Sequence, residues 1–205
     1  MEALEDCPIF NYNYPRRTTM KQSLGNKPLI YPQPVLIVAT YNQDGTANAM
    51  NAAWGGVCDY TKVSLILDRN HKTVQNLLER KAFTLSIADV EHLVEADYFG
   101  IVSGHKVSDK VARAGLDYSR SQVVDAPVIE AFPLTLECQL VSYDKETERA
   151  IAQVMNTLAE DSILTEGRID LEKFHPITYD PVNHHYIALG KQVGRAYSDG
   201  KRLSN

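Results

Sequence analysis

The 205-residue sequence has few cysteines and no motif that pairs them. Cys7, Cys58 and Cys138 lie far apart, and no CxxC pair exists, which argues against a zinc or iron–sulfur site. An odd number of cysteines with no secretory signal predicts reduced thiols in the cytoplasm. Cys138 falls in an apolar, alternating run, so we expect its thiol to be buried and inert.

Positive charge and long apolar runs are also scarce. Lys and Arg number 21 against 26 Asp and Glu, for a formal net charge of -5. Nucleic-acid surfaces need clustered cations, so we expect no nucleic-acid partner. No run approaches about 18 consecutive apolar residues, so we expect no membrane span. The N-terminus lacks the basic and apolar regions of a secretory signal.

The common nucleotide and nucleophile motifs are missing as well. The sequence contains no GxGxxG and no GxxxxGK[ST], the usual signatures of dinucleotide and triphosphate cradles. It also contains no GxSxG nucleophile elbow. The adjacent His184 and His185 would point to opposite faces of a strand, which argues against a metal pair. We therefore predict no metal site and no protein nucleophile.

Short strands dominate what the sequence does contain. Asp44-Gly45 marks a hairpin, because glycine accepts a positive φ. Helical spacing of apolar residues predicts three short helices, at 73–80, 91–98 and 109–114. Many short strands with few helices favour a barrel or sandwich over βαβ units. Apolar or alternating runs predict strands at 35–40, 46–54, 63–68, 83–87, 134–143, 149–158 and 186–189.

The predicted return strand of the hairpin is rich in small residues, from Asn48 to Gly56. Small side chains allow a flat ligand to approach the backbone closely. Strand alternation places Asn48, Met50, Ala52 and Trp54 on one face. The alternative is an ordinary strand whose alanines pack beneath a helix.

Two further segments suit a phosphate group. Arg69, His71 and Thr73 lie where a strand ends and a helix begins, and a helix N-terminus attracts anions. The alternative is that Asn70 or Thr73 is simply an N-cap beside solvated cations. The segment from Ser103 to Lys110 also leads into a helix, although a plain solvated loop would have the same composition.

In this order, the segments resemble the flavin reductase-like, FMN-binding split-barrel family, and within it the flavoredoxin-like branch. The resemblance covers about residues 31–201 and leaves residues 1–30 as an extended N-terminal segment before a 31–205 domain. It rests on PQPVLIVATYNQDGTANAMNAAW, LILDRNHKTVQNLLERKAFTLSI, SGHKVSDK, PVIEAFPLTLECQL and HYIALGKQVGRAYSDGKRL.

The resemblance implies a mainly β fold: a six-stranded antiparallel Greek-key split barrel with a few peripheral α-helices. It also implies a homodimer with non-covalent FMN near the dimer interface. Tyr197, supplied by the partner subunit, would cover the second flavin face or else anchor the C-terminus. Carried over by position, the cofactor-binding residues are Asn48, Met50, Asn51, Ala52, Ala53 and Trp54 beside the ring, Arg69, His71 and Thr73 at the phosphate, and Ser103, Gly104 and Lys110.

The activity that this family implies is reduction of flavin by NAD(P)H and transfer of electrons to a small-molecule or protein acceptor. One departure affects it: many relatives carry a His-bearing strand where this chain has Glu148-Arg149. A flavin-binding electron carrier without reductase activity is the main alternative. A pyridoxamine phosphate oxidase-like enzyme and a dimeric structural module with an empty pocket are the others.

Overall fold

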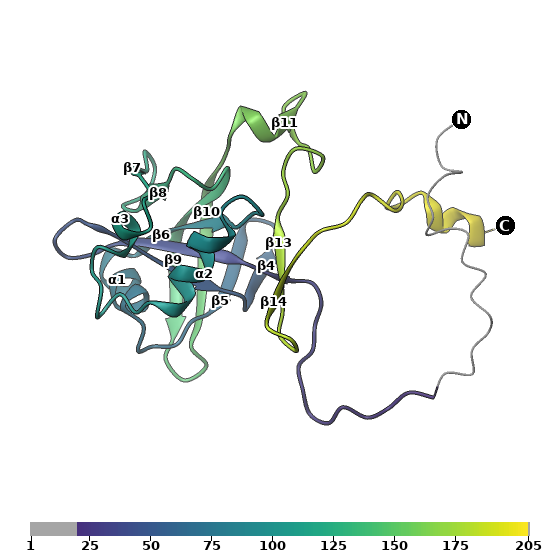
Figure 1. The fold of residues 1–205 in the computed structure, drawn as a ribbon, viewed down its shortest axis with the longest axis horizontal. Coiled ribbons are helices and arrows are strands. Elements are labelled where there is room, and N and C mark those ends of the chain that lie inside the picture. Colours follow the sequence, from purple (N-terminus) through teal and green to yellow (C-terminus); the bar gives the residue numbers. More distant parts are fainter. Residues whose placement is uncertain (1–19, 205) are drawn as a thin grey trace.

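The computed structural model describes residues 20–204. Cys7 and most of the predicted N-terminal segment lie outside the described residues. The chain folds around one curled antiparallel sheet with the strand order β3-β2-β6-β9-β10-β5-β4 (Figure 1). Its strands are β2 (Leu36–Tyr41), β3 (Ala47–Ala52), β4 (Gly55–Asp59), β5 (Lys62–Ile66), β6 (Ala82–Ile87), β9 (Leu134–Asp144) and β10 (Arg149–Ala159).

Smaller elements surround this sheet. β1 (Gln33–Pro34), β13 (Ile177–Asp180) and β14 (His185–Ala188) form a second sheet, and β7 (Tyr118–Arg120) pairs with β8 (Pro127–Ile129). β11 (Leu164–Thr165) pairs with β12 (Arg168–Ile169). The helices are α1 (Lys72–Arg80), α2 (Leu93–Ile101) and α3 (Lys110–Arg113), with 3-10 turns η1 (Asp161–Ile163) and η2 (Asp199–Leu203). None of the described helices is long and apolar enough to cross a membrane.

The mainly β split-barrel prediction is confirmed, but the principal sheet has seven strands rather than six. The extra strand arises because the predicted return strand stops at Ala52 and resumes as β4 at Gly55. A Cβ at Gly55 would lie 2.3 Å from the Leu65 side chain, so glycine allows β4 to pass close to β5. The chain therefore changes direction at Ala53 and Trp54.

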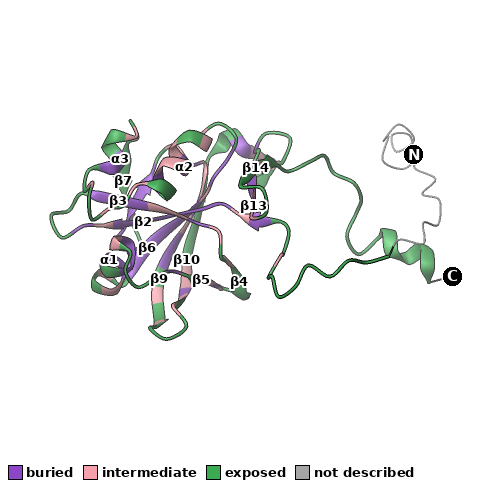
Figure 2. Cartoon of the chain, turned by 60° about the horizontal axis from the view of Figure 1, so that its bottom comes forward, coloured by how far each residue is buried: buried purple, intermediate pink, exposed green. Residues whose placement is uncertain are grey.

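Strand alternation divides most of the buried apolar side chains between two large cores, and Ala82, Val124 and Ala126 form a small third cluster. One core fills the space between the curled sheet and α1, and includes Val38, Leu65, Leu77 and Phe83. The other lies beneath α2 and includes Ile37, Phe99 and Ile129. Burying one such large apolar side chain contributes about 1.5–3 kcal/mol. The buried and exposed segments separate clearly in Figure 2. The predicted burial of Cys138 is confirmed, and this burial raises the pKa of the thiol to about 12, whereas its inertness stays a prediction.

The sheet has two open edges, at β3 and β4, because each has a hydrogen-bonded neighbour on one side only. Trp54 lies between these edge strands in the sequence and is 60% exposed. Two segments, 20–32 and 189–204, extend away from the barrel on the same side (Figures 1 and 2). We call them the N-terminal and C-terminal arms. Both carry exposed apolar side chains, among them Met20, Ile30 and Leu203.

Candidate functional site

The structure brings the three predicted ligand segments together around Asn48. The Asn48 side chain, on β3, is buried, and its Nδ2 donates to the hydroxyl of Thr73 at 2.7 Å. The loop after α2 crosses directly over this pair at Gly104. A Cβ added to Gly104 would lie 2.3 Å from Asn48 Oδ1 and 3.2 Å from the Lys72 Cβ. Only glycine fits this crossing without displacing a neighbour.

One atom of this cluster lacks a partner. Asn48 Oδ1 is buried and accepts no hydrogen bond from the residues that the structure describes. Leaving a buried acceptor unsatisfied costs about 1–3 kcal/mol. Such atoms in native proteins call for an explanation, and a ligand that donates a hydrogen bond is one.

Beside this cluster, α1 begins with an open end. His71 occupies the N-cap position, makes no side-chain capping bond, and is followed by no acidic residue in the first turn. The unpaired N–H groups and partial positive charge of a helix start therefore remain available. The capping alternative for Asn70 and Thr73 is wrong. Thr73 is 2% exposed and lies inside the helix, where its hydroxyl serves Asn48.

The two loops that flank the helix start are joined to each other. The His105 ring donates from Nε2 to the Asn70 carbonyl oxygen at 3.0 Å. Ser103 Oγ accepts from the backbone N–H of His105 at 3.3 Å. The side chain of His71 is exposed in this region. The predicted residues Ser103, Gly104, His71 and Thr73 thus belong to one surface region that is built on β3.

Arg69 is held by an acidic residue that lies far away in the sequence. Its Nε donates to Glu148 Oε1 at 3.1 Å, and its backbone N–H donates to the same oxygen at 3.2 Å. Glu148 adopts φ 57° in the turn between β9 and β10. It belongs to the Glu148-Arg149 pair at which the sequence departs from the family resemblance. Here its carboxylate pairs with one of the cations near the start of α1, whose first residue, Lys72, is a second one.

Lys110, a predicted flavin contact, has a buried side chain in the folded chain. It is 2% exposed, and its Nζ donates to the carbonyl oxygens of Val102 at 2.8 Å and Phe99 at 3.3 Å. Burial lowers the pKa of this amine to about 8. In the single chain, Lys110 therefore anchors the end of α2 beneath the Ser103–Gly104 loop. Direct contact with a flavin stays a prediction.

The side chains of β3 alternate between two faces as predicted, but the face with Asn48, Met50 and Ala52 points toward the barrel core. Met50 and Ala52 pack against the barrel core, on the same side as Asn48. Asn51 and Ala53 face the opposite side, where Asn51 Nδ2 donates to the Ala96 carbonyl oxygen of α2 at 3.0 Å. Contact between a flavin and 50–52 would therefore run through the open backbone edge of β3 rather than through side chains.

Tyr197 lies apart from these residues in the single chain. It sits on the C-terminal arm with φ 58° and is fully exposed. Its predicted role over a flavin face therefore requires a second subunit and stays a prediction.

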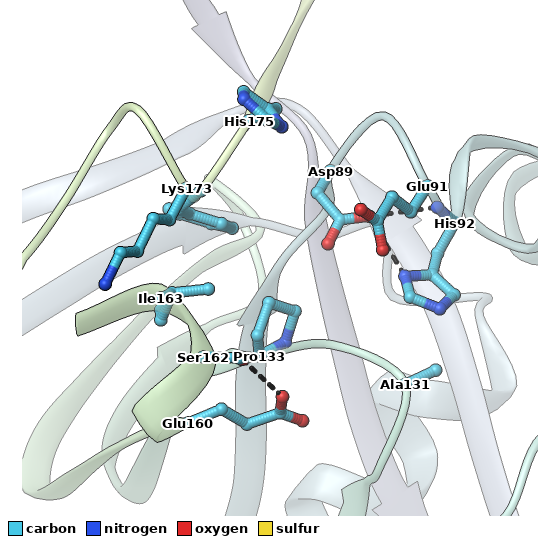
Figure 3. Close-up of a pocket in the computed structure, with 11 residues that line it drawn as sticks. Asp89, Glu91, His92, Ala131, Pro133, Glu160, Ser162, Ile163, Lys173 and His175 are labelled. Carbon is cyan, nitrogen blue, oxygen red and sulfur yellow. Dashed lines mark hydrogen bonds and ion pairs between the residues drawn. The ribbon is translucent and has the colours of Figure 1, made fainter.

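One cavity lies beside this region, and another lies away from it. The first, of about 340 Å³, is open to solvent, is bordered by β3, α2 and the β13–β14 hairpin, and includes Asn51 and Ala53. The other, of about 280 Å³, shares no residue with the predicted set (Figure 3). In it, buried Asp89 accepts from the His92 ring at 3.0 Å, and Lys173 donates to a backbone carbonyl. Within residues 20–204, no three His, Cys, Asp or Glu side chains are grouped to hold a metal ion.

Comparison with known proteins agrees with this geometry. The model of the flavin reductase like domain matches residues 29–179, which is most of the chain. The chain belongs to the flavin reductase-like family. It is 36% identical to the structure of flavoredoxin of Desulfovibrio vulgaris (Miyazaki F), with a TM-score of 0.84, covering 88% of this chain and all of that one.

Two further relatives of this flavin reductase-like chain are more distant. A flavoredoxin structure from Methanosarcina acetivorans is 24% identical with a TM-score of 0.81, covering 90% of this chain and 100% of the other. An uncharacterized protein of Aquifex aeolicus is 25% identical over 162 residues, which is 73% of this chain and 81% of that protein.

Several residues of the region escaped sequence reasoning. His105 and Glu148 join segments that are distant in sequence, and Asp97, Tyr179 and Tyr186 line the larger cavity. The signal for His105 was its place between Gly104 and two lysines. No pattern in the sequence pairs Glu148 with Arg69.

Proposed function

We propose that this chain binds FMN non-covalently along the open edge of β3 and passes electrons from the reduced flavin to an acceptor. The observation that carries the proposal is the cradle at Asn48: a buried oxygen without a partner, beneath a glycine crossing, next to an uncapped helix start. Membership of a flavin reductase-like family and the likeness to a flavoredoxin support the choice of ligand.

Each part of the region suits one part of FMN. The first-turn N–H groups of α1, with Arg69 and His71, would hold the phosphate. Asn48 Oδ1 would accept a hydrogen bond from a ribityl hydroxyl, with Thr73 fixing the amide. The open backbone edge of β3 offers N–H and C=O groups to the polar side of the flavin ring. Trp54, exposed at the end of that edge, would contact the ring.

This placement determines what FMN and the protein would each contribute. Bound FMN supplies the redox chemistry, and the protein supplies position, electrostatics and control of water. Lys110 keeps the end of α2 in place, and Gly104 lets the following loop lie against Asn48. Glu148 limits the positive charge that Arg69 adds to the phosphate end.

The electron donor that we propose is NAD(P)H, which makes the protein an NAD(P)H-dependent flavin oxidoreductase. One observation favours a second candidate, an electron carrier without reductase activity. Glu148 neutralises Arg69, whereas NAD(P)H carries a pyrophosphate that would need cations near the flavin. The likeness to a protein named flavoredoxin points the same way.

We also propose that the active form is a homodimer. Apolar side chains are exposed near the β4 edge, including Trp54, Val57 and Tyr60, and both arms project from the barrel without covering it (Figure 2). An exposed sheet edge with apolar residues is a site for association. A second subunit would bring its own arm, and with it Tyr197, toward the flavin.

Anaerobic titration separates these functions. The FMN-loaded protein is mixed with NADH or NADPH, and bleaching of the visible flavin band is followed. Bleaching by either nucleotide supports the oxidoreductase. Reduction by dithionite but by neither nucleotide supports the carrier, and failure of the purified protein to take up FMN refutes both.

A further inference from the structure

The cavity between β3, α2 and the β13–β14 hairpin lies beside the proposed flavin edge but on the other face of β3. It has a volume of about 340 Å³, and Asn51 of β3 and Ala53, just after the strand, line this side. Asn48 and the phosphate end lie on the opposite face of the strand. A molecule in this cavity would therefore lie next to the ring end of the proposed FMN, against the side chain of Asn51 rather than the open backbone edge of β3.

The shape of the cavity suits a flat ring. Tyr179 and Tyr186 form an aromatic wall, with ring centroids 6.0 Å apart and planes tilted by 51°. His184 adds a third ring, 6.3 Å from that of Tyr179. Two small residues, Ala53 and Gly100, also line the cavity. Aromatic and small lining residues are typical of sites for planar ligands.

Hydrogen bonds fix these walls in the chain itself. Tyr186 donates to Asp97 Oδ1 at 2.9 Å, and Tyr179 shares a hydrogen bond with His184 Nδ1 at 2.8 Å. Burial, together with the bond to Asp97, raises the pKa of Tyr186 to about 12. The Tyr186 ring therefore stays uncharged, and these hydrogen bonds hold the tyrosine rings in place.

The remaining polar groups set the charge that the cavity accepts. When the Tyr179 hydroxyl donates to His184 Nδ1, Nε2 carries the proton and can donate to a ligand oxygen. Asp97 is the one carboxylate among the lining residues that the structure describes, and no Lys or Arg lines the cavity with it. An anionic ligand would be repelled, while a neutral ring with a carbonyl oxygen meets a donor and aromatic faces.

We propose that this cavity binds a planar, uncharged aromatic dicarbonyl compound of the quinone class, as the electron acceptor of the chain. The acceptor role rests on the proposed function, whereas binding of the ring does not. A quinone that takes two electrons from the reduced flavin, together with two protons, leaves as the hydroquinone. The flavin returns to its oxidised state, so electrons and atoms balance.

The test uses 2-(hydroxymethyl)anthraquinone, which is neutral, and anthraquinone-2-carboxylate, which is its anionic counterpart. Neither adds to thiols, so the exposed Cys58 does not interfere. Each is titrated into flavin-free protein, and quenching of the tyrosine and tryptophan fluorescence is measured. We expect saturable binding of the neutral quinone, and binding of the carboxylate weaker by about tenfold or more. Equal or tighter binding of the carboxylate would overturn the proposal.

Two variants locate the binding. Gly100→Leu should place a branched apolar side chain in the cavity and strongly weaken quinone binding, while the protein still binds FMN. A Cβ at Gly100 makes only an ordinary 3.4 Å contact with Asn51, so the backbone tolerates the change. Gly190→Leu, where an added Cβ meets nothing within 4 Å, is the matched control. Asp97→Asn should reduce the difference in binding affinity between the neutral and the anionic quinone. Unaltered quinone binding in folded Gly100→Leu would place the ligand elsewhere and refute the assignment.

The outcomes separate the two proposals. Wild-type protein that binds the quinone but not FMN would refute the proposed function and leave the cavity assignment standing. Wild-type protein that binds FMN but no quinone would refute this inference alone. In the doubly loaded protein, reoxidation of reduced flavin by the neutral quinone should saturate, and Gly100→Leu should remove the saturation.

Discussion

Replacing Gly104 by alanine tests the crossing over Asn48. The added Cβ would lie 2.3 Å from Asn48 Oδ1, whereas ordinary contacts begin at 3.4 Å, so a gap of 3.4 − 2.3 = 1.1 Å must open. The amide cannot simply swing aside, because it is buried and bonded to Thr73 at 2.7 Å. The loop that carries Ser103 and Gly104 must move instead.

Overpacking of this kind costs about 1–3 kcal/mol. Because the loop covers the proposed FMN cradle, we expect the cost to appear as FMN affinity weakened by about five- to 150-fold. The assay is quenching of flavin fluorescence on titration of FMN with flavin-free protein, with thermal unfolding to check the fold. Gly56→Ala, where an added Cβ meets nothing within 4 Å, is the control.

A second substitution identifies the contact. Asn48→Ala should weaken FMN binding less in the Gly104→Ala protein than in wild type, because it removes the amide with which the added Cβ clashes. For residues in contact, we expect the two substitutions to be coupled by about 0.5–3 kcal/mol. The reasoning would be refuted if the Gly104→Ala protein had the same FMN affinity and melting temperature as the Gly56→Ala protein.

The remaining predictions concern three charged or aromatic residues. Glu148→Gln should strengthen FMN binding by about two- to fivefold in calorimetry, because an exposed ion pair with Arg69 no longer competes with the phosphate; weaker binding would mean that Glu148 positions Arg69. In the folded chain, the pKa of Lys110 is lowered to about 8. Between pH 8 and 10.5 the unfolded chain therefore binds more protons than the folded chain, so the contribution of Lys110 to the free energy of unfolding rises with pH. Urea unfolding at pH 8 and pH 10 should show a gain of about 2 kcal/mol in wild type relative to Lys110→Met; equal gains would contradict the burial of a charged amine. Tyr197→Ala should change flavin affinity or the rate of flavin reduction without altering the circular dichroism spectrum, and wild-type values for both would make Tyr197 purely structural.

The fold was predictable where side-chain alternation coincides with burial. Phe83 and Leu85 lie on one face of β6 and Thr84 on the other, and the structure has that strand at Ala82–Ile87. β4 escaped prediction because Gly55-Gly56-Val57-Cys58-Asp59 has no alternation and is mostly exposed. Pairing with β5 rather than local propensity makes it a strand.

The site was predictable in its segments but not in its contacts. The order of motifs identified β3, the start of α1 and the loop at Gly104 as parts of one region. Thr73 and Lys110 have residue types that usually lie at the surface, and nothing local indicates that tertiary contacts bury both. The pairing of Arg69 with Glu148 joins residues separated by 79 positions, which no local pattern encodes.

The proposed function requires a phosphate-dependent flavin site at the start of α1. Calorimetric titration of flavin-free protein with FMN and with riboflavin tests it in a single comparison. One charge-assisted hydrogen bond to phosphate is worth about 1.5–3 kcal/mol, so FMN should bind about ten- to a hundredfold more tightly than riboflavin. Equal affinity for the two flavins, or no binding of either, would contradict the account.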